Sequence, residues 1–584
     1  MAGRAGRCRC DQDGAGVVTT DPITLEVTRH ALESIAEDMV FTVLRISQST
    51  VVKLSMDFST AVCGPDGTLL VQGLSSALHL GAMPDMMRAV LGRFGDDIGV
   101  GDVFVTNDPY QGGMHIPDVF VVRAVHDEAG VLLGFAVVVC HHVDMGGRVP
   151  GSIAADSTEI HQEGLRIPPI RLVHRGVKQQ VVLDILCANV RMPDLVMADL
   201  RAQLAACATA ARGLTELARR MGTGELLDYC THLVEYGERL ARAEISRWPD
   251  GEYRFEDCID NDGIGDTPLP VVVTLTVAGD GLRVDLAGTA DKAAGAINAT
   301  LPSTKAAVYA AVRYFLPVDV PNNEGFFRVV DIDAPVGSLV NVSMPAACAA
   351  RGVTMFRVFD TVLGALDLAC PGTVFAGSDG GSTGVSFGGT RSDGSRYVFV
   401  DFFAGSWGAR SGLDGIDGCA TPAGNAVNEP VELIEAGVPV RIEEYGYVPD
   451  TGGAGQYRGG LAVRRSYRLV DGEAMVHVRS DRSVRAPFGL HGGADGTVSG
   501  TTLTQDGETR DMPSKFTRRL VAGDLVVHTL PGGGAVGLAA DRRPEAVAAD
   551  VIAGKTTPAA ADRWYGTAWR LVPTPAHPTR KALS

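Results

Sequence analysis

The sequence predicts a multi-domain α+β protein, with an N-terminal domain of mixed helix and sheet and a glycine-rich, β-dominated C-terminal half. The chain has 584 residues, enough for roughly two to four domains with their own cores. Helical and strand patterns alternate up to about residue 250, whereas strands joined by glycine-rich turns predominate afterwards. Hydrophobic residues make up 45% of the chain and charged residues 21%, a balance typical of globular proteins rather than disordered ones.

These patterns divide the chain into five parts. They are a disordered tail over 1–20, an α+β domain over 21–250, a mixed β/α segment over 251–350, a β-rich domain over 351–540, and a C-terminal helix and tail over 541–584.

Composition excludes several classes of protein. The net charge is −17 and no basic patch of the nucleic-acid-binding type is present. The first residues contain arginines but no apolar segment of a signal peptide, and the longest apolar run, Gly130–Cys140, is too short to span a membrane. The eleven cysteines are scattered without a CxxC pair, which indicates reduced, mostly buried thiols. We therefore expect a cytoplasmic protein that binds neither nucleic acid nor membrane.

The N-terminal domain begins with helical and hairpin signals. Asp21-Pro22 opens an amphipathic helix that is expected to run to about Thr50. The turn Asp66-Gly67 lies between two apolar runs and predicts a hairpin. A helix over Asp85–Phe94 and a strand over Val103–Thr106 follow.

Three helices close this domain, and the chain then changes to strands. The helices are expected over Val181–Val190, Pro193–Arg220 and Gly224–Ile245, where together with the first helix they can cover one face of a sheet. Beyond residue 250, a hairpin of strands over 271–277 and 282–286 and a helix over Thr304–Phe315 precede the glycine-rich half.

The most informative stretch is NDPYQGGMHIPDVFVVRAVHDEAGVLLGFAVVVCHHVDMGG, over residues 107–147. Two β-branched runs, Val119–Val125 and Val131–Cys140, flank a polar turn and predict a β-hairpin. Antiparallel pairing about that turn places Asp118 opposite Val139 or Cys140. His115 then lies near two adjacent histidines at the open end of the hairpin.

Four potential metal ligands therefore converge: His115, Asp118, His141 and His142. Adjacent residues of a regular strand point to opposite faces, so only one of the two neighbouring histidines can bind easily, and the other can orient a ligand or transfer protons. Imidazole and carboxylate ligands without cysteine suit one divalent transition metal, Zn, Mn or Fe. The alternative is an ordinary turn with packed, hydrogen-bonded histidines, and spacing alone gives the two readings about equal weight.

Several longer segments resemble one family. They are NDPYxGGxHxPDV and HHxDxGG in this stretch, TEIxQEGLRIPP at 158–169, NxxNxPVE at 425–432, and PDTGGAGQYRGG at 449–460. They resemble the hydantoinase B / 5-oxoprolinase B-type family, which includes N-methylhydantoinase B and is related to subunits of caprolactamase and of acetone and acetophenone carboxylases. The resemblance extends over nearly the whole chain.

The resemblance implies roles for individual residues. It adds Asp57 to His115, Asp118 and His141 as metal ligands. His79 is a candidate for a place close to the site, with a histidine at the entry of a helix as the alternative of equal weight. His142 and Asp144 are then candidates for proton transfer. Polar residues of the 158–169 segment are candidates for substrate binding, with an internal salt bridge as the alternative of equal weight; they are Glu159, Glu163 and Arg166.

The family also implies a reaction and a partner. A hydantoinase A-type subunit uses ATP to activate a cyclic amide, and the B-type subunit completes a metal-assisted ring opening, so we expect a hetero-oligomer. This chain has no nucleotide-binding site of its own, because Gly554-Lys555-Thr556 imitates the end of a P-loop but Ala549 replaces its first glycine. The alternatives are a subunit of an ATP-dependent ketone carboxylase and a non-catalytic scaffold subunit. Hydantoin, 5-oxoproline, a larger lactam and a ketone all remain open as substrates.

Overall fold

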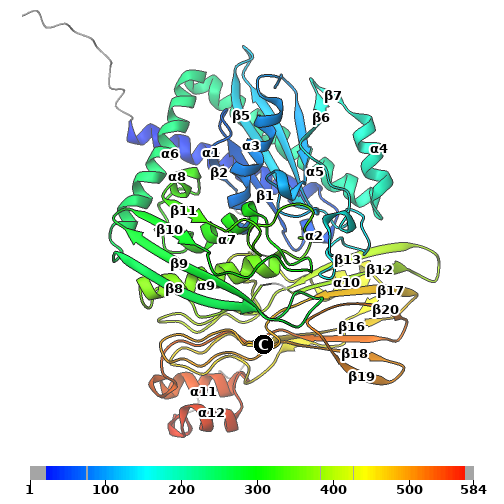
Figure 1. Cartoon of the computed structure of the whole chain (residues 1–584), viewed down its shortest axis with the longest axis vertical. Helices are drawn as coiled ribbons and strands as arrows, with labels where there is room; N and C mark the ends of the chain where they lie inside the picture. Colours follow the sequence, from blue (N-terminus) through cyan, green and yellow to red (C-terminus); the bar gives the residue numbers. More distant parts are fainter. Residues whose placement is uncertain (1–20, 74–75, 382, 425, 573–584) are drawn as a thin grey trace, which may run out of the picture.

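The computed structural model describes residues 21–73, 76–381, 383–424 and 426–572, so the predicted tail over 1–20 and Asn425 of the NxxNxPVE segment lie outside these ranges. Within them the chain forms four β-sheets with helices packed between and around them (Figure 1). The predicted α+β architecture with a strand-rich C-terminal half is confirmed.

The first sheet carries the central hairpin. It has seven strands in the order β2-β1-β5-β4-β3-β6-β7, and every neighbouring pair is antiparallel. The strands are β1 (Phe58–Cys63), β2 (Leu69–Gln72), β3 (Val103–Thr106), β4 (Asp118–His126), β5 (Leu132–His141), β6 (Ile170–His174) and β7 (Val177–Lys178). The predicted hairpins and the third strand are therefore confirmed.

Both faces of this sheet are buried, because helices cover each one. Alternate residues of β4 and β5 divide between two cores: Val121 and Val138 pack toward α1 and α5, whereas Phe120 and Val139 pack toward α3 and α7. The helices that start this region are α1 (Pro22–Ile46), α2 (Thr50–Lys53) and α3 (Met83–Phe94), and those that end it are α4 (Gln180–Asn189), α5 (Pro193–Met221) and α6 (Thr223–Ile245). The opening helix ends four residues earlier than expected.

The register of the central hairpin differs from the prediction. Asp118 pairs with His141, not with Val139 or Cys140. The cause is an irregularity near the turn, where Val125 pairs with Gly134 but His126 pairs with Leu132. The extra residue on β5 moves every later pair by one position and brings the last residue of β5 opposite the first residue of β4.

A second sheet lies beside the first, in the order β11-β10-β9-β8. Its strands are β8 (Gly251–Ile259), β9 (Leu269–Ala278), β10 (Gly281–Asp285) and β11 (Val330–Asp333), accompanied by α7 (Leu301–Arg313) and α8 (Glu324–Phe327). Helix α9 (Gly352–Ala369) packs on β8 and β9 and was not predicted. Nearly all of its residues are buried, so it has no polar face from which a helical period could be recognised. The predicted boundary at residue 350 therefore falls just before a helix that packs on the preceding sheet.

Two further sheets, packed face to face around a core that includes Phe387, Tyr467 and Val526, form the lower part of Figure 1. One contains β12 (Thr383–Thr390), β13 (Arg396–Phe403), β17 (Glu473–Arg479) and β20 (Lys515–Val521). The other contains β14 (Val440–Arg441), β15 (Tyr445–Tyr447), β16 (Val463–Leu469), β18 (Gly500–Gln505), β19 (Glu508–Met512) and β21 (Leu525–Thr529).

Short helices complete the chain: α10 (Val431–Gly437), α11 (Pro544–Ile552) and α12 (Pro558–Tyr565). Gly554-Lys555-Thr556 lies in the turn between α11 and α12, and not within the tail helix as expected. The Lys555 ammonium is paired with Asp417 at 2.7 Å, so this segment does not resemble a phosphate-binding loop.

Two features of composition have structural counterparts. The nine cysteines among the described residues are all unpaired, and six of them are buried, as predicted. In the same part of the chain, no helix combines the length and hydrophobicity needed to cross a bilayer.

Candidate metal centre

Three neighbouring strands bring carboxylate and imidazole side chains to one end of the first sheet. His141 is the last residue of β5, Asp118 is the first residue of β4, and the two pair directly. On the other side of β5, Asp57 immediately precedes β1, and its carbonyl accepts the backbone N–H of His141 at 3.0 Å. The three side chains are therefore fixed by backbone pairing within a rigid sheet.

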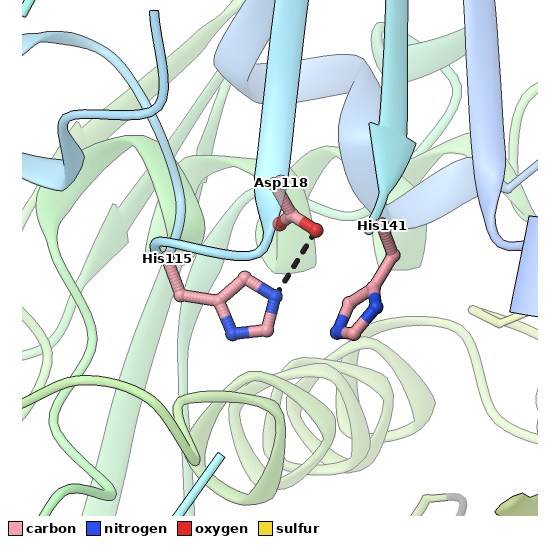
Figure 2. Close-up of side chains that lie close together, drawn as sticks. All are labelled: His115, Asp118 and His141. Atoms are coloured by element: carbon pink, nitrogen blue, oxygen red, sulfur yellow. Dashed lines mark hydrogen bonds and ion pairs between the residues drawn. The ribbon is translucent and has the colours of Figure 1, made fainter. Parts of the chain in front are cut away.

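His115 reaches the same place from the loop before β4. Asn107 holds that loop, because its side-chain amide donates to the carbonyls of Ile116 and Leu165 at 2.7 and 3.0 Å. The ring of His115 lies between two acceptors, with Nδ1 at 2.9 Å from the Ala349 carbonyl and Nε2 at 3.0 Å from Asp118 Oδ1 (Figure 2).

A neutral His115 cannot satisfy both neighbours. The Ala349 carbonyl and the Asp118 carboxylate can each only accept, so a neutral ring donates to one of them and directs the lone pair of its other nitrogen at the other. Burial, followed by the positive charge of Arg351, lowers the pKa of His115, which disfavours a second proton on the ring. When the proton is on Nδ1, the Nε2 lone pair and the Asp118 carboxylate repel each other, and a cation between or beside them removes that repulsion.

His141 completes the group from the opposite side. Both of its ring nitrogens are buried, and neither has a hydrogen-bond partner among the described residues. Its ring lies beside that of His115, as Figure 2 shows. The two ring centroids are 5.1 Å apart. His115, Asp118 and His141 each provide one potential ligand atom, and these three atoms lie within 4.8 Å of one another. A buried histidine whose nitrogens have no hydrogen-bond partner, next to a carboxylate, is the arrangement expected of a metal ligand.

Asp57 lies outside this three-residue group but lines the same cavity. Burial, and then the negative charge of Asp118, raises the pKa of its carboxyl to about 7. His79 is beside it, with Nε2 at 3.6 Å from Asp57 Oδ1 and Nδ1 at 2.9 Å from the Ser59 hydroxyl.

The cavity above these residues has a volume of about 50 Å³. Besides three imidazoles and the Asp57 carboxylate, its wall contains two arginines and two phenylalanines: Arg351, Arg479, Phe356 and Phe402. Arg351 donates to Asp118 Oδ2 at 2.5 Å, and His115 and Arg351 together overcome the effect of burial, so the pKa of Asp118 lies well below its usual value.

Two candidate catalytic residues face elsewhere. His142 points to the opposite side of the sheet, as strand geometry predicts, and its Nε2 lies 3.0 Å from the Gln203 side chain on α5. Asp144 accepts the N–H groups of Gly146 and Arg191 and pairs with the Arg191 guanidinium at 2.9 Å. Neither residue lines the cavity.

The three candidate substrate-binding residues are also outside the cavity. Glu163 is buried and accepts the backbone N–H groups of Cys348 and Ala349 at 2.7 and 2.8 Å. Arg166 lies 3.4 Å from Asp108, and Glu159 is exposed at a backbone bridge to Ala346. Glu163 therefore holds the carbonyl that positions His115, whereas the other two fasten the loop.

Sequence reasoning missed Arg351 and Arg479. Arg351 lies 233 positions from Asp118, the acid that it contacts, and Arg479 is the last residue of β17 in another sheet. No spacing rule connects residues so far apart. Asp57 had no signal of its own either, apart from the family segment that contains it.

The fold and these side chains define a large multi-sheet α+β protein with a buried cluster of imidazole, carboxylate and guanidinium groups at the ends of interior strands. The chain belongs to the hydantoinase B/oxoprolinase family, whose model matches residues 21–539.

Individual relatives agree with this assignment. The B subunit of a putative D-/L-hydantoinase from Pseudomonas sp. (strain NS671) is 34% identical, over 94% of this chain and 95% of its own length. The crystal structure of the ATP-dependent caprolactamase from Pseudomonas jessenii has 30% identity and a TM-score of 0.88, over 94% of this chain and 96% of that one. A nucleotide-free acetone carboxylase structure also gives a TM-score of 0.88, over 94% of this chain and 80% of that one, but at 19% identity it shows the shared fold alone.

Proposed function

We propose that this chain is the B-type subunit of an ATP-dependent cyclic-amide hydrolase and that it opens the ring of a substrate activated by an A-type partner. The observation that carries the proposal is the pair of orphaned nitrogens of His141, buried beside His115 Nε2 and the Asp118 carboxylate. The location is proposed to be cytoplasmic.

The residues present fit a divalent transition metal. His115, Asp118 and His141 would hold it, and Asp57 would be the fourth ligand from across the cavity. Zn, Mn and Fe all accept this set of nitrogen and oxygen ligands. When bound, such an ion polarises a carbonyl and activates water, which is the chemistry that amide ring opening needs.

The chain's own residues prepare the site in three ways. Arg351 fixes the orientation of Asp118, and the Ala349 carbonyl fixes the ring of His115. Phe402 packs edge-on against His141 with ring centroids 5.1 Å apart and forms an apolar part of the cavity wall. Because His142 and Asp144 bond to Gln203 and Arg191, we assign them to positioning the strand end rather than to proton transfer.

The partner is proposed to supply ATP-dependent activation. An amide carbonyl is a poor electrophile because of resonance, and phosphorylation of its oxygen removes that resonance. One relative is described as the B subunit of its enzyme and another as ATP-dependent, which agrees with such a division of labour, since this sequence contains no P-loop. We propose a stable hetero-oligomer for this reason, because a phosphorylated amide hydrolyses readily in water.

Elemental analysis of ligand variants tests the metal. The purified wild-type chain should contain about one transition metal ion, as expected of a single site. His115→Ala and Asp118→Ala should each lose it while remaining folded by circular dichroism. His161→Ala, which removes an exposed histidine from the neighbouring loop, is the matched control and should keep it. A metal-free wild-type chain that is fully active with its partner would refute the proposal.

Two alternative functions lead to different experimental results. A ketone carboxylase subunit would turn over a ketone and bicarbonate with ATP but leave hydantoin, 5-oxoproline and caprolactam unchanged. A scaffold subunit would show no loss of activity when the metal ligands are replaced.

A further inference from the structure

Arg479 is an anomaly among the buried arginines of this protein. Seven arginines are buried in the described part of the chain, and six of them form an ion pair; they are Arg351, Arg357, Arg458, Arg465, Arg482 and Arg542. Arg479 is only 6% exposed, yet no hydrogen bond or ion pair joins its guanidinium to another described residue. A buried charge without a partner is costly, so a permanent structural role does not explain it.

The side chain is nevertheless held firmly in one place. Its guanidinium lies 5.3 Å from the centroid of the Phe402 ring. Its other side lies against the backbone of β12 at Gly384, where a Cβ atom would be 2.5 Å from Nε. These contacts direct the charged end into the cavity that it shares with His115 and His141.

One carboxylate, that of Asp57, lines the same cavity as this guanidinium but forms no ion pair with it. The other charged groups around it are positive. Arg351 lines the same cavity, and its Nε is buried without a partner. Helix α9 begins at Gly352 with no side-chain cap, and a Cβ on Gly352 would be 3.5 Å from the Arg479 Nη1 atom. A helix N-terminus carries a partial positive charge, so two guanidinium groups and a helix end meet at one point. Burial, and then repulsion by Arg351, lowers the pKa of Arg479 to about 10, so it remains charged at neutral pH.

We propose that Arg479 and Arg351, with the N-terminus of α9, form an oxyanion subsite that binds an anionic oxygen-rich group of the substrate beside the His/Asp group. Guanidinium groups donate paired hydrogen bonds that match phosphate and carboxylate oxygens. The cavity of about 50 Å³ has room for one small oxyanion, since roughly 10–15 Å³ of such volume is enough to hold one water molecule.

Two sources can supply such an anion. A phosphoryl group is common to every substrate that a partner activates with ATP, whereas a carboxylate is present in 5-oxoproline but absent from hydantoin and caprolactam. The assignment of the anion to a substrate rests on the proposed function, but the existence of the subsite does not.

Calorimetric titration of the purified chain with sodium orthophosphate tests the subsite, with the metal content of each sample measured in parallel. Wild type should bind phosphate saturably. Arg479→Met, which keeps the length of the side chain but removes its charge, should bind it at least about tenfold more weakly with unchanged metal content. Arg479→Lys retains a charge without the guanidinium fork and should be intermediate. Arg518→Met, at an exposed arginine of β20, is the matched control and should bind as wild type does.

Thermal unfolding provides a second readout. Phosphate should raise the melting temperature of wild type but not that of Arg479→Met. Without phosphate, Arg479→Met should melt no lower than wild type, because it removes an unpaired buried charge. Sodium acetate distinguishes the sources: weaker binding than phosphate indicates a phosphoryl group, and equal or tighter binding indicates a carboxylate.

Unchanged phosphate binding in both Arg479 variants, or no saturable binding to wild type, would overturn the subsite. If the wild-type protein contains no metal but still binds phosphate through Arg479, the proposed function is refuted and the oxyanion subsite is not.

Discussion

At the scale of single residues, the two adjacent histidines have different surroundings, and we propose metal binding for one and structural support for the other. His141 has free nitrogens in the cavity, whereas His142 bonds to Gln203 on the other face of the sheet. His141→Ala should therefore lose the metal. His142→Ala should keep most of it but lose about 1–3 kcal/mol of stability, because Gln203 loses a buried partner. Elemental analysis and urea unfolding measure the two effects, and the reverse pattern would exchange the two roles.

His477 makes stability depend on pH. It is buried, and its Nε2 accepts the Ala155 backbone N–H at 3.1 Å. Burial lowers its pKa from 6.5 to about 4, so the unfolded chain binds the proton more tightly than the folded chain between these values. The stability that a neutral His477 contributes is therefore present above pH 6.5 and is lost as the pH falls toward 4, at no more than about 1.4 kcal/mol per pH unit.

His477→Gln should reduce this acid sensitivity, since its amide oxygen can still accept the Ala155 N–H but does not titrate in this range. Urea unfolding from pH 7.5 to 5 measures the change, with the exposed His161→Gln as the control. Identical pH slopes for His477→Gln and wild type would show that the histidine is not the titrating group.

The sequence allowed some of these residues to be predicted and not others. His115, Asp118 and His141 stood out because one hairpin brings its two ends together, and Asp57 was added only by the family resemblance. Arg351 and Arg479 were not predicted, because they approach the site from other parts of the fold. Glu163 was assigned a possible substrate contact, yet its carboxylate accepts two backbone N–H groups.

At the scale of elements, the segment around Glu163 acts as a clamp on the loop that precedes α9. Its carboxyl holds Cys348 and Ala349, and the Ala349 carbonyl in turn holds His115. Burial raises the pKa of Glu163 to about 8, so the neutral acid predominates at pH 7. Glu163→Gln should therefore retain metal binding, because its amide oxygen can accept the same two N–H groups.

Glu163→Ala removes that acceptor and should weaken metal affinity by about tenfold or more, in the range seen for residues that orient metal ligands. Competition with a chromogenic chelator measures the affinity of both variants. Equal affinity of Glu163→Ala and wild type would show that the clamp does not position His115.

Helices were predicted accurately where one face of the helix is apolar and the opposite face is polar. Helices α5 and α6 have clear apolar stripes, and their bounds were predicted to within one residue. Helix α9 is buried on all sides and gave no such stripe. The pairing register of β4 and β5 was off by one to two residues, since a bulge near the turn cannot be recognised from an apolar run.

At the scale of the whole molecule, the site is assembled from distant parts of the chain. The first sheet and the segments next to it supply the imidazoles and carboxylates, while Phe402 and Arg479 come from the C-terminal strands and Arg351 from the segment before α9. The cavity therefore exists only when the N-terminal and C-terminal halves pack together. Sequence patterns describe each half of the chain separately. For this reason they did not predict all the residues that line the cavity.

This assembly leads to a prediction about activity. Because the sequence has no P-loop and Lys555 is paired with Asp417, the isolated chain should neither hydrolyse ATP nor open a cyclic amide. Together with an A-type subunit it should do both, and the two should form a complex that buries well over about 1,000 Å². Phosphate release and ring opening, measured on the separate and the mixed subunits, check this. Robust ATP hydrolysis by the isolated chain would contradict it.

The central claim is that the His/Asp group at the end of β4 and β5 carries out ring opening. Its most direct test is a turnover assay on the complex reconstituted with an A-type subunit, comparing wild type with His115→Ala. We predict that the wild-type complex opens the ring as ATP is consumed, and that the His115→Ala complex assembles normally but forms no ring-opened product. Ring opening at the wild-type rate by a metal-free His115→Ala complex would contradict the claim.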